Sequence, residues 1–174
     1  DSYQQFLNVY NLMRDLRNGL YYHAYDDLRE SFWCDKVTGL SDNFWLRALG
    51  WYAMALIDTM EVMPEETLGD EKKEMNRIYK ELIDSMLPYQ DEKTGMWYQV
   101  VNRGGIRPNY LETSGSAIFA YAIMKSVRLG FLDESYFAYG KKAFDGICET
   151  YLSEENGELQ LGGICLVAGL GNKE

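Results

Sequence analysis

Hydrophobic residues recur at helical spacing in five long segments of this chain. Apolar positions three and four apart predict helices over residues 3–16, 42–63, 71–87, 110–129 and 134–151. The helices at 42–63 and 110–129 are apolar almost all round, which is typical of helices buried on most sides. The helices at 71–87 and 134–151 carry one apolar stripe each: Met75, Ile78, Tyr79, Leu82, Ile83 and Met86 in the former, and Phe137, Phe144, Ile147, Cys148 and Tyr151 in the latter.

The connections between these helices repeat. A glycine turn followed by a short strand-like stretch occurs at 19–25, 94–100 and 156–161, after the first, third and fifth helices. The repeating unit is therefore a helix, a turn-strand loop and a second helix. A unit of this size predicts stacked or ring-closed helical hairpins. The alternation of buried and amphipathic helices favours a two-layer ring, with inner helices inside outer ones.

Local signals also suggest where helices begin and end. Ser41 and Asp42 are good N-cap residues for the second helix, and Pro64 follows its end. Small residues open the fourth helix at 114–117, and small residues let neighbouring helices approach closely.

Composition narrows the range of functions. The chain has 174 residues, which suits one domain, and its 27 acidic against 17 basic residues give a net charge of −10, which disfavours nucleic-acid binding. The longest apolar stretch, 44–63, contains Arg47, Asp58 and Glu61, so a buried helix is expected there and not a membrane span. Three scattered cysteines and a single histidine argue against a zinc site or a disulfide framework.

One candidate binding stretch lies at the start of the second helix. Arg47 and Trp51 are four residues apart and share a helix face, whereas Trp45 lies two residues before Arg47. A guanidinium beside aromatic rings suits a carboxylated sugar, because arginine pairs bidentately with carboxylates and aromatic faces stack on sugar rings. The alternatives are that the two tryptophans belong to the core and that Arg47 forms an internal ion pair with Asp42 or Glu112.

A second candidate stretch, residues 110–116, opens the other mostly buried helix. It places the carboxylate of Glu112 and three hydroxyl groups near the same end of the predicted ring. These hydroxyls could equally satisfy backbone donors in the first helical turn. His23, in the aromatic loop at 19–25, is either structural or part of the same site.

These stretches carry a family resemblance. The runs at 19–23 (GLYYH), 44–56 (FWLRALGWYAMAL), 110–117 (YLETSGSA) and 163–171 (GICLVAGLG) resemble the C-terminal half of the unsaturated rhamnogalacturonyl and glucuronyl hydrolases, glycoside hydrolase families 105 and 88. The resemblance implies an all-α fold, the six-hairpin (α/α)6 toroid. Residues 1–174 would be the C-terminal portion of a single catalytic domain. Five helices make only a partial ring, so the missing N-terminal half or another chain is expected to cover it.

The resemblance also implies an activity. These enzymes remove a terminal 4,5-unsaturated uronic acid from pectin-derived oligosaccharides by hydrating its double bond, and the unstable product releases the rest of the sugar chain. The family's catalytic Asp is expected upstream of this chain. His23, Trp45, Arg47 and Trp51 match positions that line the family's substrate pocket. No metal or organic cofactor is expected, since hydration needs only a proton donor and water, and a cytoplasmic or periplasmic bacterial location is expected.

The match has departures, and two other functions stay open. Leu46 and Leu49 stand where the family commonly has small polar residues, which affects the expected subsite preference. A non-catalytic helical-repeat protein that binds glycans or peptides is one alternative. Another α/α toroid enzyme that acts on neutral sugars is the second, and Arg47 would then lack an anionic partner.

Overall fold

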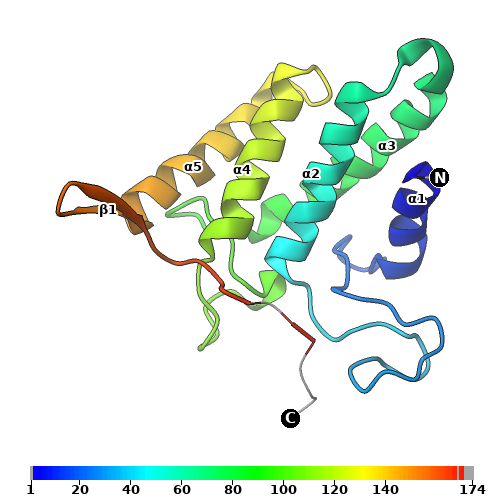
Figure 1. Cartoon of the computed structure of the whole chain (residues 1–174), viewed down its shortest axis with the longest axis horizontal. Helices are drawn as coiled ribbons and strands as arrows, with labels where there is room; N and C mark the ends of the chain where they lie inside the picture. The colour runs from blue at the N-terminus through cyan, green and yellow to red at the C-terminus, as the bar shows by residue number, and fades with distance from the viewer. Residues whose placement is uncertain (1, 168, 171–174) are drawn as a thin grey trace.

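The computed structural model describes residues 2–167, 169 and 170, which fold into helices with one small β-hairpin (Figure 1). The described α-helices are α1 (Ser2–Met13), α2 (Leu46–Val62), α3 (Glu65–Met86), α4 (Thr113–Arg128) and α5 (Phe137–Tyr151). Short 3-10 turns occur at η1 (Leu87–Tyr89), η2 (Val101–Arg103) and η3 (Glu134–Tyr136). The hairpin consists of β1 (Leu152–Glu155) and β2 (Glu158–Leu161), paired antiparallel with Leu152 opposite Leu161.

Successive helices along the chain run alternately down and up (Figure 1). Contacts connect α1 to α3, α3 to α2, α2 to α4 and α4 to α5, so α2 and α4 are central neighbours with the same direction. Their N-terminal ends lie at the same end of the molecule, where the loops before them gather (Figure 1). The alternating pattern predicted inner helices beside outer ones, and α2 and α4 are the inner pair.

The core fills the space between the inner and outer helices. The apolar stripe predicted for α3 is confirmed, since all six of its side chains are fully buried: Met75, Ile78, Tyr79, Leu82, Ile83 and Met86. They pack in one cluster with α2 residues such as Leu56 and Ile57 and with Phe119 of α4. Trp97 from the loop before α4 is also fully buried, and its indole nitrogen donates to the Met86 carbonyl at 2.9 Å.

The stripe predicted for α5 is confirmed only in part, since Ile147 is buried while Cys148 and Tyr151 are half-buried. Phe137 and Phe144 are exposed, and the buried positions of α5 are Gly140, Ala143, Gly146 and Ile147. A Cβ at Gly146 would lie 1.7 Å from the Thr94 carbonyl oxygen, so α5 packs by bringing its backbone close to its neighbours. The large side chains point away because small residues make this close contact.

Three predicted helix starts need correction, and α4 begins at Thr113 and not at residue 110. α3 begins at Glu65, directly after Pro64, and not at residue 71. α2 begins at Leu46 and not after Ser41 and Asp42, and Trp45 occupies its N-cap position without a side-chain cap. The reason is a long-range contact: the Leu46 amide donates to the Gln99 carbonyl at 3.0 Å, so a backbone acceptor replaces the cap.

The strand-like connections form short bridges rather than a continuous sheet. Antiparallel bridges join Arg14 with Tyr21, Tyr25 with Leu40, Trp45 with Val100 and Tyr98 with Leu111. Only the third predicted stretch contributes a full strand, β2. The bridges fix the loops before α2 and α4 against each other at the N-terminal ends of these helices.

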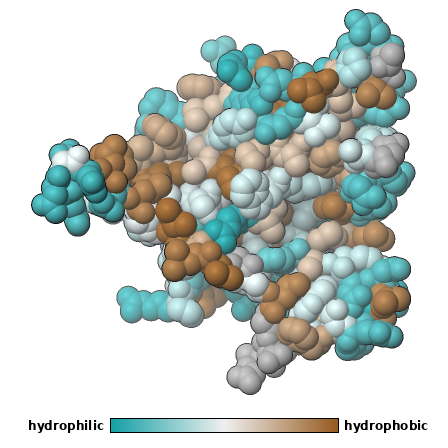
Figure 2. Space-filling model, in the orientation of Figure 1, coloured by the Kyte–Doolittle hydropathy of each residue, from teal (hydrophilic) through white to brown (hydrophobic). Residues whose placement is uncertain are grey.

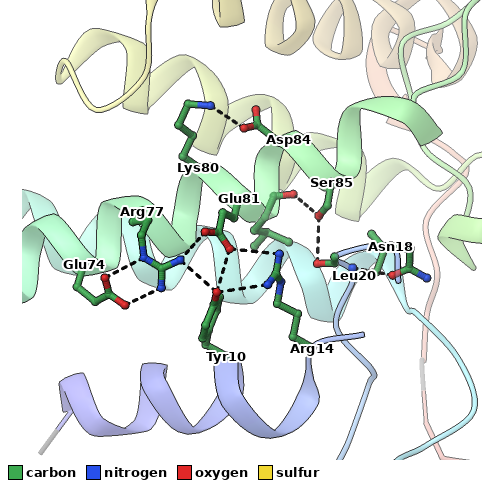
Figure 3. Close-up of polar contacts among 12 residues, drawn as sticks. Tyr10, Arg14, Asn18, Leu20, Glu74, Arg77, Lys80, Glu81, Asp84 and Ser85 are labelled. Carbon is green, nitrogen blue, oxygen red and sulfur yellow. Dashed lines mark hydrogen bonds and ion pairs between the residues drawn. The ribbon is translucent and has the colours of Figure 1, made fainter. Parts of the chain in front are cut away.

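Charged residues attach α1 to the outside of α3 (Figure 3). The Tyr10 hydroxyl donates to Glu81 at 3.0 Å and accepts hydrogen bonds from both Arg14 and Arg77. Arg14 and Arg77 also form ion pairs with Glu81, and Arg77 forms a further one with Glu74. This network is half-exposed, so it fixes the position of α1 more than it stabilises the core.

Large apolar side chains remain on the surface. On the faces of α2 and α4 that point away from the core, Trp51 and Tyr121 are 53% and 42% exposed. Further exposed apolar residues gather over the hairpin and the chain that follows it (Figure 2): Leu159, Leu161, Ile164, Leu166 and Val167. Within the described residues, no helix combines the length and hydropathy needed to span a bilayer.

Candidate functional site

The candidate site lies where α2 and α4 begin. The loop containing His23, the loop before α4 and the segment after β2 meet at this end of the helices (Figure 1). Backbone hydrogen bonds join them: the Val101 amide donates to the Phe44 carbonyl at 3.0 Å, and the Thr113 amide donates to the Gly163 carbonyl at 2.9 Å. Segments far apart in the sequence therefore build one surface around the first turns of the two inner helices.

Arg47 projects from the first turn of α2 toward the start of α4. Its Nη1 donates to the Ser114 hydroxyl at 3.4 Å and to the backbone carbonyl of Cys165 in a short hydrogen bond. No ion pair of Arg47 is found among the described residues, so the alternative of an internal pair with Asp42 or Glu112 is wrong for them. The guanidinium is half-buried, and no carboxylate among the described residues is in direct contact with it.

Glu112 has a structural role at this site. Its fully buried carboxylate caps α4 by accepting from the backbone amides of Ser114 at 3.0 Å and Gly115 at 2.7 Å. It also accepts from the Ser114 hydroxyl at 2.7 Å and from the Cys165 amide at 2.9 Å. Both groups that hold Arg47 are thus themselves held by Glu112. This carboxylate is therefore linked to Arg47 through Ser114 and Cys165 and does not contact it directly.

His23 lies against Trp45. Their rings meet edge to face with centroids 5.5 Å apart, and both side chains are half-buried. Burial lowers the pKa of His23, so the imidazole is neutral near pH 7. Its Nδ1 is buried and has no hydrogen-bond partner in the described part of the chain.

Trp51 lies one helical turn beyond Arg47 on the same side of α2. Its 53% exposure contrasts with the full burial of Leu56 and Ile57 on the opposite side, so Trp51 is not a core residue. It offers an exposed indole surface on the helix face that also carries Arg47. The four predicted residues therefore fall into one pair in contact, His23 and Trp45, and one pair along a helix face, Arg47 and Trp51.

Two residues of this arrangement were not predicted as part of the site. The sequence marks Ser114 only as one of several hydroxyls near the end of the ring, and Cys165 only as part of the motif at 163–171. Cys165 acts through its backbone carbonyl and amide. Every residue type has these groups, so the sequence could not indicate this role. The last motif continues to Ala168 and Gly171, which lie outside the described residues. Among the described residues, no three His, Cys, Asp or Glu side chains gather in a way that could hold a metal ion.

Comparison with known proteins agrees with this geometry. The sequence profile of Glycosyl Hydrolase Family 88 matches residues 1–174. Protein Atu3128 of Agrobacterium fabrum (strain C58 / ATCC 33970) is 38% identical over 176 residues, covering 98% of this chain and 73% of that protein. Unsaturated rhamnogalacturonyl hydrolase YesR of Bacillus subtilis (strain 168) is 26% identical over 159 residues, covering 91% of this chain and 40% of that enzyme.

A solved structure gives the same result. The glycoside hydrolase from family 105 of C. acetobutylicum ATCC 824 superposes with a TM-score of 0.92 at 41% identity, covering 98% of this chain. This chain spans 47% of the length of that structure. The described helices accordingly form part of an α/α toroid, as the sequence predicted. The chain belongs to glycosyl hydrolase family 88 and is related to the unsaturated uronyl hydrolases of families 88 and 105.

Proposed function

We propose that the protein containing this chain removes a terminal 4,5-unsaturated uronic acid from pectin-derived oligosaccharides, such as the unsaturated rhamnogalacturonan disaccharide. A proton adds to C4 of the double bond and a water oxygen adds to C5. The resulting hemiketal opens and releases the remaining sugar. Membership in the family and the similarity to YesR support this reaction class.

The observation that carries the proposal is the state of Arg47. Its guanidinium is fixed on one side by Ser114 and the Cys165 carbonyl, and it has no acidic partner among the described residues. A half-buried cation without a counterion favours binding of an anion. A uronate carboxylate fits because it accepts two parallel hydrogen bonds from a guanidinium. Neutral sugars would leave this charge uncompensated.

The aromatic residues supply the rest of the proposed subsite. Trp45 and Trp51 flank Arg47 in the sequence of α2, and their indole rings can stack on the planar face of an unsaturated uronate ring. His23 is held beside Trp45, and its neutral ring can donate or accept a hydrogen bond to a sugar hydroxyl. We assign substrate binding to these four residues.

We assign the catalytic carboxyl to a residue outside this chain. Glu112 is the buried carboxylate of the site, and its oxygens already accept four hydrogen bonds from Ser114, Gly115 and Cys165. A carboxylate whose two oxygens are both engaged as a helix cap is not free to contact a sugar ring. An upstream Asp, as in the family resemblance, would take the role of acid and base.

We also propose that residues 1–174 form the C-terminal portion of a single toroid domain. The exposed Trp51 and Tyr121 would then face the interior of a complete ring. Helices from elsewhere in the same protein, or from another chain, would close that ring. The shares of the related proteins that this chain covers support this arrangement.

The function is tested by the loss of ultraviolet absorbance when the conjugated uronate is consumed. The full-length product of the gene is incubated with unsaturated rhamnogalacturonan disaccharide, as wild type and as Arg47→Lys. We expect wild type to consume it and Arg47→Lys to lose about 30-fold or more in kcat/KM, equivalent to ~2 kcal/mol for a charge-assisted hydrogen-bond pair.

The matched control is Arg128→Lys, an exposed arginine at the far end of α4, which should retain wild-type rates. If wild type leaves every unsaturated disaccharide intact, the proposed reaction is wrong. If Arg47→Lys keeps full activity, the role given to Arg47 is wrong while the reaction stands.

A further inference from the structure

A second hollow adjoins the candidate site. It has a volume of about 360 Å³ and is lined by Asn43 and by residues 99–100, 103 and 106–110 of the loop before α4. Its walls combine the apolar side chains of Ile106 and Pro108 with the ring of Tyr110 and several polar groups. None of the four residues assigned to the uronate subsite lines it, so it is a separate space.

Hydrogen bonds connect the residues of the hollow with those of the Arg47 site. Gln99 lines the hollow, and its side-chain amide donates to the Cys165 thiol at 3.0 Å, in the residue whose carbonyl holds Arg47. Asn43 also lines the hollow, and its carbonyl accepts the His23 amide. Residues that line the hollow therefore form hydrogen bonds with Cys165 and His23, which belong to the Arg47 site.

The charges around the hollow are of one sign. Arg103 and Arg107 line it, and no acidic residue does. Both side chains are exposed, and in the described part of the chain neither guanidinium forms an ion pair or a hydrogen bond. By contrast, Arg14, Arg17 and Arg77 all have acidic partners. In a chain of net charge −10, two unpaired arginines at one hollow form a local positive site.

The loop that carries these arginines has a defined shape. The Asn109 side chain accepts from the Val100 amide at 3.0 Å and donates to the carbonyls of Val100 at 3.0 Å and Arg103 at 2.8 Å. These bonds close the loop across its base. Gln99 adds a buried side-chain oxygen without a partner among the described residues, which is available to a hydroxyl donor.

We propose that this hollow is a subsite for a second acidic sugar of the oligosaccharide, whose carboxylate pairs with Arg103 and Arg107 while its ring packs on Tyr110. The inference rests on the proposed function, because it places this sugar on the chain that leaves the unsaturated uronate. Gln99 and Asn43 would contact its hydroxyls. The preferred substrate is accordingly an oligosaccharide with a further uronate beyond the bond that is cleaved.

The test compares two substrates with the full-length gene product. One is the unsaturated disaccharide with a neutral second sugar, and the other is an unsaturated tetrasaccharide that contains a further uronate. The double variant Arg103→Ala/Arg107→Ala should keep kcat/KM on the disaccharide within about twofold. On the tetrasaccharide it should lose about tenfold, mainly through KM, because two exposed ion pairs to the substrate are lost. Added salt should reduce the preference of wild type for the tetrasaccharide.

Arg128→Ala is the matched control, and it should behave like wild type on both substrates. Equal losses on both substrates, or no loss on either, would overturn the proposal. A separate titration with saturated oligogalacturonate measures binding without turnover, and the double variant should bind it about tenfold more weakly. If wild type turns over neither substrate, the proposed reaction fails. The titration then decides on the subsite, and an unchanged affinity in the double variant rejects it.

Discussion

At the scale of single residues, Glu112 determines how the site is held together. It is fully buried, and its oxygens accept hydrogen bonds from Ser114, Gly115 and Cys165, so donors at the start of α4 and after β2 satisfy it. The same carboxylate thereby fixes the hydroxyl and the carbonyl that hold Arg47. A change at Glu112 should affect both stability and substrate binding.

We predict that Glu112→Gln lowers the free energy of unfolding by about 2 kcal/mol or more. The amide would turn an N–H₂ group toward backbone N–H donors, leaving at least one buried donor without an acceptor. Urea unfolding followed by circular dichroism measures this. Glu149→Gln, at an exposed position of α5, is the control and should stay within about 0.5 kcal/mol of wild type. A similar small effect at Glu112 would contradict the capping role.

At the scale of elements, α2 and α4 approach each other closely through glycines. A Cβ at Gly115 would lie 2.5 Å from the Leu46 side chain and 3.1 Å from the Arg47 amide, and one at Gly50 would lie 3.1 Å from Ile118. The expectation that small residues allow close packing of the fourth helix is confirmed at Gly115. This approach brings the first turns of the two helices, and with them Arg47 and Ser114, to hydrogen-bonding distance.

We predict that Gly115→Ala forces these first turns apart. It should destabilise the fold by about 1–3 kcal/mol, as overpacking of a filled contact does, and should raise KM by displacing Arg47. Gly69→Ala in α3 is the control, because its added methyl group would meet only a Glu65 oxygen at 3.6 Å. It should be neutral or slightly stabilising in thermal unfolding. Unchanged stability and KM for Gly115→Ala would show that the helices tolerate a wider spacing.

The elements also show how far the sequence could predict this fold. The number and type of the helices follow from local periodicity, and so does the buried stripe of α3. The start of α2 does not, because its first amide is satisfied by Gln99, more than fifty residues later in the chain. At the candidate site, Arg47 and its aromatic neighbours could be proposed from residue type and from the family resemblance. Their grouping with Ser114 and Cys165 could not, since it depends on a backbone carbonyl brought there by the fold.

At the scale of the whole molecule, the exposed apolar side chains indicate that further helices are expected to cover this chain. Trp51 and Tyr121 on the inner helices, and Phe137 and Phe144 on α5, are all more than 40% exposed. Apolar faces of this kind on helices are typical of surfaces that other helices cover. This agrees with the proposal that residues 1–174 are one portion of a ring.

We predict that isolated residues 1–174 bind more of a hydrophobic fluorescent dye per molecule than the full-length gene product does. Covering the inner face should remove dye sites and should shield Trp51 from a soluble quencher of its fluorescence. Trp97 is fully buried in the chain itself, so its contribution should be unchanged and serves as an internal reference. Equal dye binding and equal quenching in both proteins would contradict the proposed closure of the ring.

The hydrogen bond from Arg47 to Cys165 also has a consequence for biosynthesis. The two residues are separated by 118 positions, so a ribosome completes α2, α3, α4 and α5 before the carbonyl that orients the arginine has been made. During that interval the inner helices can already pair, while the guanidinium still lacks its fixed position. The surface around Arg47 is therefore completed only after these helices have been synthesised.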